Sequence, residues 1–274
     1  MNLKKLTLAL TPFAVLVYSP IALADGYINE NGVIFVSSED PDQSPWKGNP
    51  KCTPTQKPSA QKGVWQTQYF YSDGSQQTNE YLSNTKALKK DCEISINFPD
   101  DIVGSGVFET NFPNGKKRSR IEYKQGTYYG KLEFWFPNGL KEQESYVIDG
   151  ISNGDYKIWH PNGQLALSMK YKNDQQDGMK QRWYETGEPW TYVRFENGQM
   201  IGELKQWFQN KKLERQGKYK DGVRHGIYKI WFNDGQPEAV LNYETGKITS
   251  AQCWTETGKE LSSTQCKKRY ADEE

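Results

Sequence analysis

Aromatic positions and turn-forming positions alternate along most of the chain with a period of 24 residues. One column of this pattern consists of Trp135, Trp159, Trp183, Trp207 and Trp231. A turn column follows it and consists of Gly139, Gly163, Gly187, Lys211 and Gly235. Because several such columns keep one register, the pattern indicates an internal repeat, and a period of this length is typical of stacked arrays.

Each repeat contains two short, aromatic-rich runs separated by a tight turn. In one repeat the runs cover residues 131–136 and 140–147, and Asn138-Gly139 lies between them. Such pairs readily adopt the positive φ angles that two-residue hairpin turns require. The pattern therefore predicts an all-β fold: an elongated single-layer meander of stacked 24-residue hairpins with roughly twelve strands. Since each hairpin would contact mainly its neighbours, the ends of the array require caps.

One run of the chain resembles a known repeat family. Residues 220–228, Lys-Asp-Gly-Val-Arg-His-Gly-Ile-Tyr, are followed by an aromatic pair and Asp-Gly. This run resembles the core of the MORN (membrane occupation and recognition nexus) repeat and is most similar to its bacterial variant. The resemblance extends over roughly residues 104–261, with Asp174, Lys211 and Ser250 in place of glycines. Choline-binding repeats also combine Trp, Tyr and Gly, but their period is shorter and their Trp-Tyr-Tyr grouping is absent here.

The resemblance carries expectations about function. It implies a stacked β-hairpin fold and offers no shared catalytic residue. Bacterial proteins of this kind are often described as antitoxin components of toxin–antitoxin pairs or as secreted repeat proteins. Eukaryotic relatives are linked with membrane lipids and with protein scaffolding.

The first 24 residues have the composition of a secretory signal peptide. Lys4 and Lys5 precede an apolar run over residues 6–18, and Ala22-Leu23-Ala24 forms a small-x-small cleavage site. A membrane anchor is the alternative, but the apolar run is too short to span a bilayer, and Pro12 and Pro20 interrupt it. We therefore predict a cleaved signal peptide and a protein that is periplasmic or secreted.

The remaining segments outside the repeats are expected to differ in order. Residues 25–62 are predicted to form an extended arm with one short strand at 32–37, and residues 63–98 a degenerate first repeat that caps the array. The repeat domain is predicted over residues 99–261. Residues 262–274 are predicted to be a tail that is loose beyond about residue 267.

Four cysteines, Cys52, Cys92, Cys253 and Cys266, lie outside the regular repeats or at their end. An even number of cysteines in an exported chain indicates disulfides. Three pairings are possible, and we favour Cys52–Cys92 and Cys253–Cys266, because the sheet between the two pairs would hold them far apart. No metal site is expected, since the chain has no Cys-x-x-Cys and only two histidines, in separate repeats.

The chemistry of the chain favours binding over catalysis. His160 and His225 occupy repeat positions and are expected to be structural, and no pair of carboxylates converges in the repeat register. We therefore predict no catalytic residue and no cofactor; a hydrolase is the weakest of three alternatives. Without the signal peptide, 33 basic and 34 acidic residues remain. Such a balance argues against a nucleic-acid partner.

The middle repeat departs from the pattern. Trp190 stands in a column otherwise occupied by Glu142, Ala166, Glu214 and Glu238. Strand alternation predicts that Trp190, Tyr192 and Arg194 share one face, and Lys180 and Arg182 replace apolar residues on the preceding strand. Lys180, Arg182, Trp190, Tyr192 and Arg194 are therefore a predicted recognition patch, since aromatic residues and arginine anchor interfaces. The alternative is that the tail or the arm covers Trp190.

These observations predict an exported, non-enzymatic scaffold that binds a protein partner, with an immunity or antitoxin protein that neutralises a toxin as one form of it. The alternative is an envelope- or host-surface-binding protein that recognises lipid or glycan through an aromatic sheet face. The oligomeric state stays open, because the free edges of the sheet could pair with a second copy.

Overall fold

The computed structural model describes residues 27–28, 34–35, 51–87, 90–91 and 101–270. The chain divides into two compact units, residues 1–44 and 45–274. In the first unit, β1 (Tyr27–Ile28) pairs antiparallel with β2 (Ile34–Phe35), and β2 falls inside the strand expected at 32–37. The predicted signal peptide lies outside the described residues. The following paragraphs concern the second unit.

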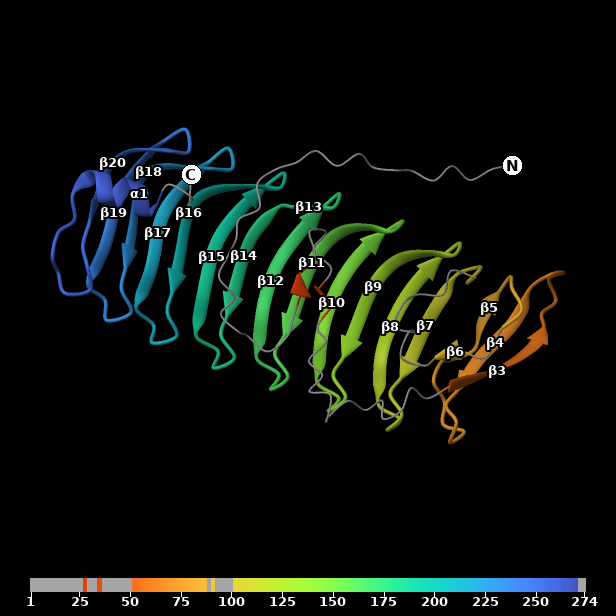
Figure 1. Ribbon diagram of the computed structural model, residues 1–274. Helices are drawn as coiled ribbons and strands as arrows, with labels where there is room; N and C mark the ends of the chain where they lie inside the picture. The colour runs from red at the N-terminus through yellow and green to blue at the C-terminus, as the bar shows by residue number, and fades with distance from the viewer. Residues whose placement is uncertain (1–26, 29–33, 36–50, 88–89, 92–100, 271–274) are drawn as a thin grey trace. The chain divides into compact units, whose positions relative to one another are not determined.

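A long antiparallel sheet makes up most of the second unit (Figure 1), and it confirms the predicted all-β meander of hairpins. Each strand pairs with the next along the chain, except that the short β13 pairs with β12 beside β14. The strands are β7 (Gly106–Asn111), β8 (Lys117–Lys124), β9 (Thr127–Trp135), β10 (Lys141–Ile148), β11 (Ile151–Trp159), β12 (Leu165–Lys172), β13 (Gln175–Gln176), β14 (Gly178–Trp183), β15 (Pro189–Glu196), β16 (Gln199–Trp207), β17 (Leu213–Lys220), β18 (Val223–Trp231), β19 (Pro237–Glu244) and β20 (Lys247–Cys253).

The turns follow the predicted chemistry. Between β17 and β18, Asp221 and Gly222 both have positive φ, 52° and 82°, the conformation of hairpin turns that match the twist of the strands. At the other end of the hairpins, Gly235 has a φ of 88°, and Lys211 holds the equivalent position with a φ of 69°. Lys211 therefore has a strained backbone conformation that glycine would adopt without strain.

A β-bulge recurs at the same position in successive repeats. Between β14 and β15, Trp183 pairs with Pro189 and Arg182 with Thr191, so that Trp190 is the extra, unpaired residue. The same register shift leaves Glu142, Ala166, Glu214 and Glu238 as the extra residues of their strands. The column that contains Trp190 is thus a bulge column, which alters the direction of its side chains.

Side chains at the turns tie neighbouring repeats together. The amides of Asn114, Asn138, Asn162 and Asn210 each donate to a backbone carbonyl of the following turn, at 2.8–3.1 Å. The histidine at this end of the hairpins acts in the same way, because His160 Nε2 lies 3.0 Å from the carbonyl of Trp183. This contact agrees with a structural role for His160. Thr186 holds the asparagine position in the middle repeat, so this link is missing there.

A smaller sheet packs against the first strands of the array. It has the order β5-β4-β3-β6, with β3 (Lys51–Pro58), β4 (Trp65–Phe70), β5 (Tyr81–Ser83) and β6 (Lys90–Asp91). Its Tyr69 and Tyr81 join Phe108 and Ile121 of the long sheet in one buried cluster. β3 lies within residues 25–62, the range expected to be an extended arm. It forms a strand because β4 pairs with it from Thr53 to Pro58.

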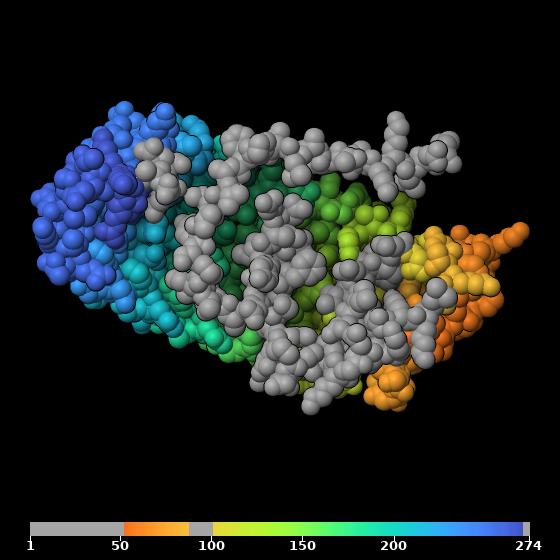
Figure 2. All heavy atoms as spheres, in the orientation of Figure 1, coloured from red at the N-terminus to blue at the C-terminus, as the bar shows by residue number. Residues whose placement is uncertain are grey.

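The C-terminal end of the long sheet is covered by α1 (Ser263–Arg269), shown in dark blue in the space-filling view (Figure 2). The helix starts at a capping box formed by Ser262 and Gln265. The predicted disulfide Cys253–Cys266 is confirmed and joins α1 to β20. Cys52 is buried and disulfide-bonded, but its predicted partner Cys92 lies outside the described residues.

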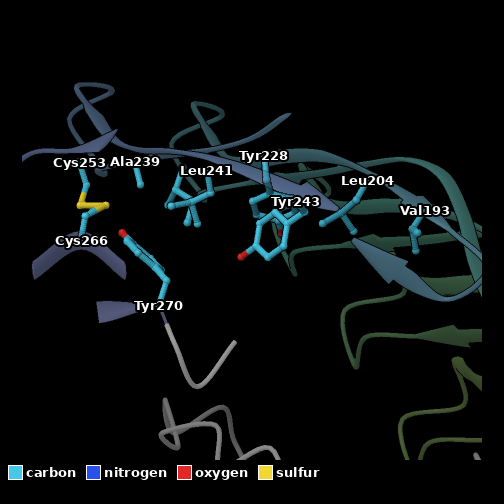
Figure 3. Close-up of a cluster of buried hydrophobic side chains, with 10 residues drawn as sticks. Val193, Leu204, Tyr228, Ala239, Leu241, Tyr243, Cys253, Cys266 and Tyr270 are labelled. Carbon is cyan, nitrogen blue, oxygen red and sulfur yellow. A yellow bond between two sulfur atoms is a disulfide. The ribbon is translucent and has the colours of Figure 1, made fainter. Parts of the chain in front are cut away.

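A second buried cluster lies under α1 (Figure 3). Tyr228, Leu241 and Tyr243 pack there with Tyr270, which is only 4% exposed. The expectation of a loose tail beyond residue 267 is therefore wrong up to Tyr270, because burial of this ring anchors the end of the helix. Gly217 lies directly beside the Tyr228 ring, and a Cβ at this position would approach it to 2.0 Å.

Candidate binding face at the middle repeat

Cross-strand pairs define the two faces of the long sheet. Tyr228 pairs with Leu241 and Ile230 pairs with Ala239, and all four side chains are buried in the cluster under α1. We call this side the helix face and the other side the opposite face. Side chains of directly paired residues lie on the same side of a sheet, so the pairing carries the helix face through the whole array.

One cross-strand row of the helix face changes character along the array. It runs through Phe134, Gln143, Ile158, Leu167, Arg182, Thr191, Gln206, Arg215, Ile230 and Ala239. The row is largely apolar before β14 and again from β18, where the cluster under α1 covers it. Between these parts it is polar, from Arg182 to Arg215.

Aromatic rings surround the cations of the middle repeat. The guanidinium carbon of Arg182 lies 3.9 Å from the ring centroid of Trp190, and Lys180 Nζ lies 5.7 Å from that of Phe195. Trp190 also stacks on Tyr184, with ring centroids 5.5 Å apart and an angle of 23° between the planes. Cation–π contacts of this kind contribute roughly 0.5–2 kcal/mol, and more as they are desolvated.

The structure divides the predicted patch between the two faces. Trp190 contacts Arg182 and therefore lies on the helix face, and Lys180 lies there too because it pairs with Val193 of the buried cluster. Tyr192 pairs with Gln181 and Arg194 with Met179, one position out of step, so both lie on the opposite face. The prediction that Trp190, Tyr192 and Arg194 share a face is wrong, because the bulge at Trp190 interrupts the alternation.

The two cations brought together are half-buried. Burial lowers the pKa of the Lys180 ammonium, and the charge of Arg182 lowers it further. Burial also lowers the pKa of Arg182, which Tyr184 partly offsets. Within the described part of the chain, neither Lys180 nor Arg182 forms an ion pair or a hydrogen bond. The arrangement is therefore suited to hold a negatively charged group.

Two contributors to this site were not singled out from the sequence. Tyr184 belongs to the turn column and Phe195 to a regular aromatic column, and neither departs from the repeat. Their contacts with Trp190 and Lys180 follow from the pairing of β14 with β15 and from the bulge. Tyr184 also lines a hollow with Phe208, Asn210 and Asn233 beside the turns.

No group of three or more His, Cys, Asp and Glu side chains is placed to hold a metal ion among the residues the structure describes. Burial raises the pKa of Glu142 to about 7, against the opposing charge of Arg118. In the same residues, no helix has the length and apolar character to cross a membrane.

Comparison with known proteins gives one result. The family model for the MORN repeat variant matches residues 105–125, 152–173, 200–221 and 224–245. No curated protein matches the chain. Lys180, Arg182, Trp190, Tyr192 and Arg194 all fall between the second and third matched segments, so the repeat with the unusual face is also one that the family pattern does not match.

Proposed function

Because the repeat region belongs to the MORN repeat variant family, a non-catalytic family of repeats that generally bind proteins or lipids, we propose that this chain is an exported, non-enzymatic scaffold that binds a protein partner. The binding surface is the helix face of the middle repeat, formed by Lys180, Arg182 and Trp190. One observation carries the proposal: Lys180 and Arg182 replace Tyr228 and Ile230, the packed apolar residues at equivalent positions under α1, and Arg182 lies against Trp190.

The composition of this surface supports a protein partner. Tryptophan and arginine are the side chains that most often dominate interface energetics. Trp190 is held between defined neighbours, Arg182 and Tyr184, so little conformational freedom would be lost on binding. Two capped ends and a stacked array hold this surface in place.

Export is supported by two features. The predicted signal peptide covers residues 1–24, and the Cys253–Cys266 disulfide fits an oxidising compartment. Among partners in such a compartment, a toxin is the class that the bacterial relatives of this repeat suggest. The chain would then act as an immunity or antitoxin protein.

Recognition of a lipid or glycan is the second candidate, and a different surface favours it. On the opposite face, Ile148 pairs with Ile151 at the end of a hairpin, and Tyr146 lies beside them. These side chains are 38%, 43% and 42% exposed. Exposed apolar side chains at a hairpin tip are suited to contact an apolar surface.

The test is a comparison of captured partners. Mature protein, residues 25–274, is used to capture proteins from a lysate of its own organism. Each retained protein is then purified, and its direct binding to the unchanged chain and to the variants is measured. We expect one protein to bind the unchanged chain and to be lost when Arg182→Met and Trp190→Ala are combined. The matched control is Tyr192→Ala with Arg194→Met, on the opposite face of the same strand.

Two outcomes would overturn the proposal. One is that the control pair weakens binding as much as the helix-face pair. The other is that the chain retains lipid or sugar and no protein, and that this retention depends on Ile148 and Ile151. The second outcome would establish the second candidate in its place.

A further inference from the structure

We infer that Lys180 and Arg182 form a carboxylate-binding site that recognises an extended acidic segment, with acidic residues at alternate positions, in the partner protein. The inference rests on the proposed function and specifies the chemistry of the partner at the same surface. Three properties of the described residues carry it: the missing counter-charge, the spacing of the two cations and the aromatic rings beside them.

The missing counter-charge distinguishes these half-buried cations from the half-buried cations of an earlier repeat. On the opposite face of an earlier repeat, Lys131 and Lys141 each contact both Glu133 and Glu144 at 2.6–2.9 Å. Arg120 likewise contacts Glu122 at 2.7 Å. The sheet thus satisfies cations with its own carboxylates where it has them. Lys180 and Arg182 carry their charges half-buried without such a partner among the described residues.

A half-buried cation gains most from an ionised ligand. Removal from water penalises the charged form, and an adjacent charge of the same sign adds to that penalty. An incoming carboxylate would offset both effects, and the guanidinium fork of Arg182 matches its two oxygens. Gln206 lies on the same row as Arg182, on the far side of Thr191, and adds an uncharged donor to this face.

The spacing of the cations selects an extended ligand. Lys180 and Arg182 are alternate residues of β14 and point to the same face. Alternate residues of a strand lie about 6.6 Å apart, which is also the spacing of alternate side chains in an extended ligand. Acidic residues at positions i and i+2 of such a ligand would reach both cations. Adjacent acidic residues would point in opposite directions and reach only one.

The surroundings favour a peptide over a lipid surface. Lys180 is flanked on its row by Val193, which is 3% exposed, and Lys180 is itself half-buried. Arg182 lies against Trp190, which stacks on Tyr184, so aromatic surface adjoins the guanidinium on this face. Attraction to an anionic bilayer depends on clusters of accessible basic residues, and the chain is close to neutral.

Two peptides of the same composition provide the test. One is an acetylated octapeptide of alternating glutamate and threonine; the other contains the same residues arranged as pairs. Binding to mature protein is measured by calorimetry at low salt. We expect the alternating peptide to bind about tenfold more tightly than the paired one, with an affinity that falls as salt is added.

Matched variants locate the site. Lys180→Met with Arg182→Met is expected to reduce binding of the alternating peptide by about tenfold or more. Lys218→Met with Lys220→Met is the control, because these lysines are alternate, exposed residues of β17 on the opposite face. This control should leave binding unchanged. Circular dichroism and thermal unfolding verify that both variants are folded.

The outcomes separate this inference from the proposed function. Equal binding of the two peptides, or equal loss in the two double variants, would overturn the inference, as would binding of phosphatidylglycerol vesicles or inorganic phosphate in place of the peptide. If these results were obtained while the captured protein still required Arg182 and Trp190, the proposed function would stand without the carboxylate site. If the captured protein still bound the variant that combines Arg182→Met with Trp190→Ala, the proposed function itself would be wrong.

Discussion

Lys180 and Arg182 of the middle repeat occupy the same positions as Tyr228 and Ile230, two repeats later in the chain. Both pairs lie on the helix face at alternate positions of a strand. Tyr228 and Ile230 are 2% and 3% exposed and pack into the cluster under α1. Lys180 and Arg182 are half-buried, and their charged groups lie over the rings of Phe195 and Trp190.

The difference shows that the repeat determines the backbone structure but not which residue types occupy the helix face. The pairing of β14 with β15 has the same register and the same bulge as the pairing of β18 with β19. At the end of the array, a cap supplies apolar surface and the face positions are apolar. In the middle, the same positions carry charge, which is costly to bury without a partner. A position of this kind is better suited to a ligand than to stability.

Exchange of the two residue types should have the largest effect. Tyr228→Lys places an ammonium in the cluster under α1, and we expect it to lower the free energy of unfolding by at least about 3 kcal/mol. Lys180→Tyr makes the reverse change at a half-buried position and should alter stability by less than about 1 kcal/mol. Urea unfolding of the two variants measures both values. Equal changes in the free energy of unfolding for the two variants would show that positions 180 and 228 do not differ as described.

The disulfide that holds the cap is expected to contribute nearly as much. Cys253 and Cys266 are 13 residues apart, and closure of a loop of this size stabilises a fold by about 3 kcal/mol in the chain-entropy model. Cys253→Ser with Cys266→Ser should therefore lower the thermal midpoint and release α1 first. Hydrogen exchange of amides in β19 and β20 measures the local loss. Protection in β10 and β11 should stay unchanged, and uniform loss would contradict nearest-neighbour stability.

The periodic part of this fold is predictable because its signals are local. Positive φ at Asp221-Gly222 requires residues that tolerate it, and the 24-residue spacing of such turns sets the length of every hairpin. The Cys253–Cys266 pair was also predictable, since both residues lie beyond the regular repeats. The short helix α1 was not predicted, although Ser262 and Gln265 have the spacing of a capping box.

The candidate site was only partly predictable, and the bulge explains why. The sequence marks Trp190 as unusual, but alternation places it with Tyr192, and the structure places it with Arg182. A bulge arises from backbone pairing between two strands, and no single residue type in the column signals it: the column contains Trp190, Glu214 and Ala166. The cations, by contrast, were recognisable because they replace apolar residues at regular positions.

Two carboxylates of the bulge column have different surroundings in the two regions, and one of them makes stability depend on pH. Glu238 bonds to Arg269 and Tyr270 of the α1 cap. Glu142 is its counterpart in an earlier repeat, and burial raises its pKa from 4.5 to about 7. Its folded pKa exceeds its unfolded value, so its contribution to stability is complete below about pH 4.5 and is lost as the pH rises through about 7.

The corresponding variant removes this dependence. Glu142→Gln should be more stable than the unchanged protein by about 2 kcal/mol at about pH 8 and equally stable at about pH 4. Urea unfolding at the two pH values measures the difference. Glu244→Gln, at an exposed position of β19, is the matched control and should show no such change. An equal gain for Glu142→Gln at both pH values would contradict ionisation as the cause.

The smallest expected effect concerns the turn between the two compared regions. Lys211 has a φ of 69° where other repeats have glycine, and its Nζ lies 2.9 Å from Glu188 Oε1 of the preceding repeat. Lys211→Gly removes left-handed strain that costs about 1 kcal/mol, and it loses a surface ion pair that contributes at most a few tenths. We expect a net gain of about 0.5 kcal/mol in thermal unfolding. Lys211→Met separates the two effects, because it removes the ion pair and keeps the strain; a loss larger than the gain from glycine would show that the ion pair, and not the backbone, decides the stability of this junction.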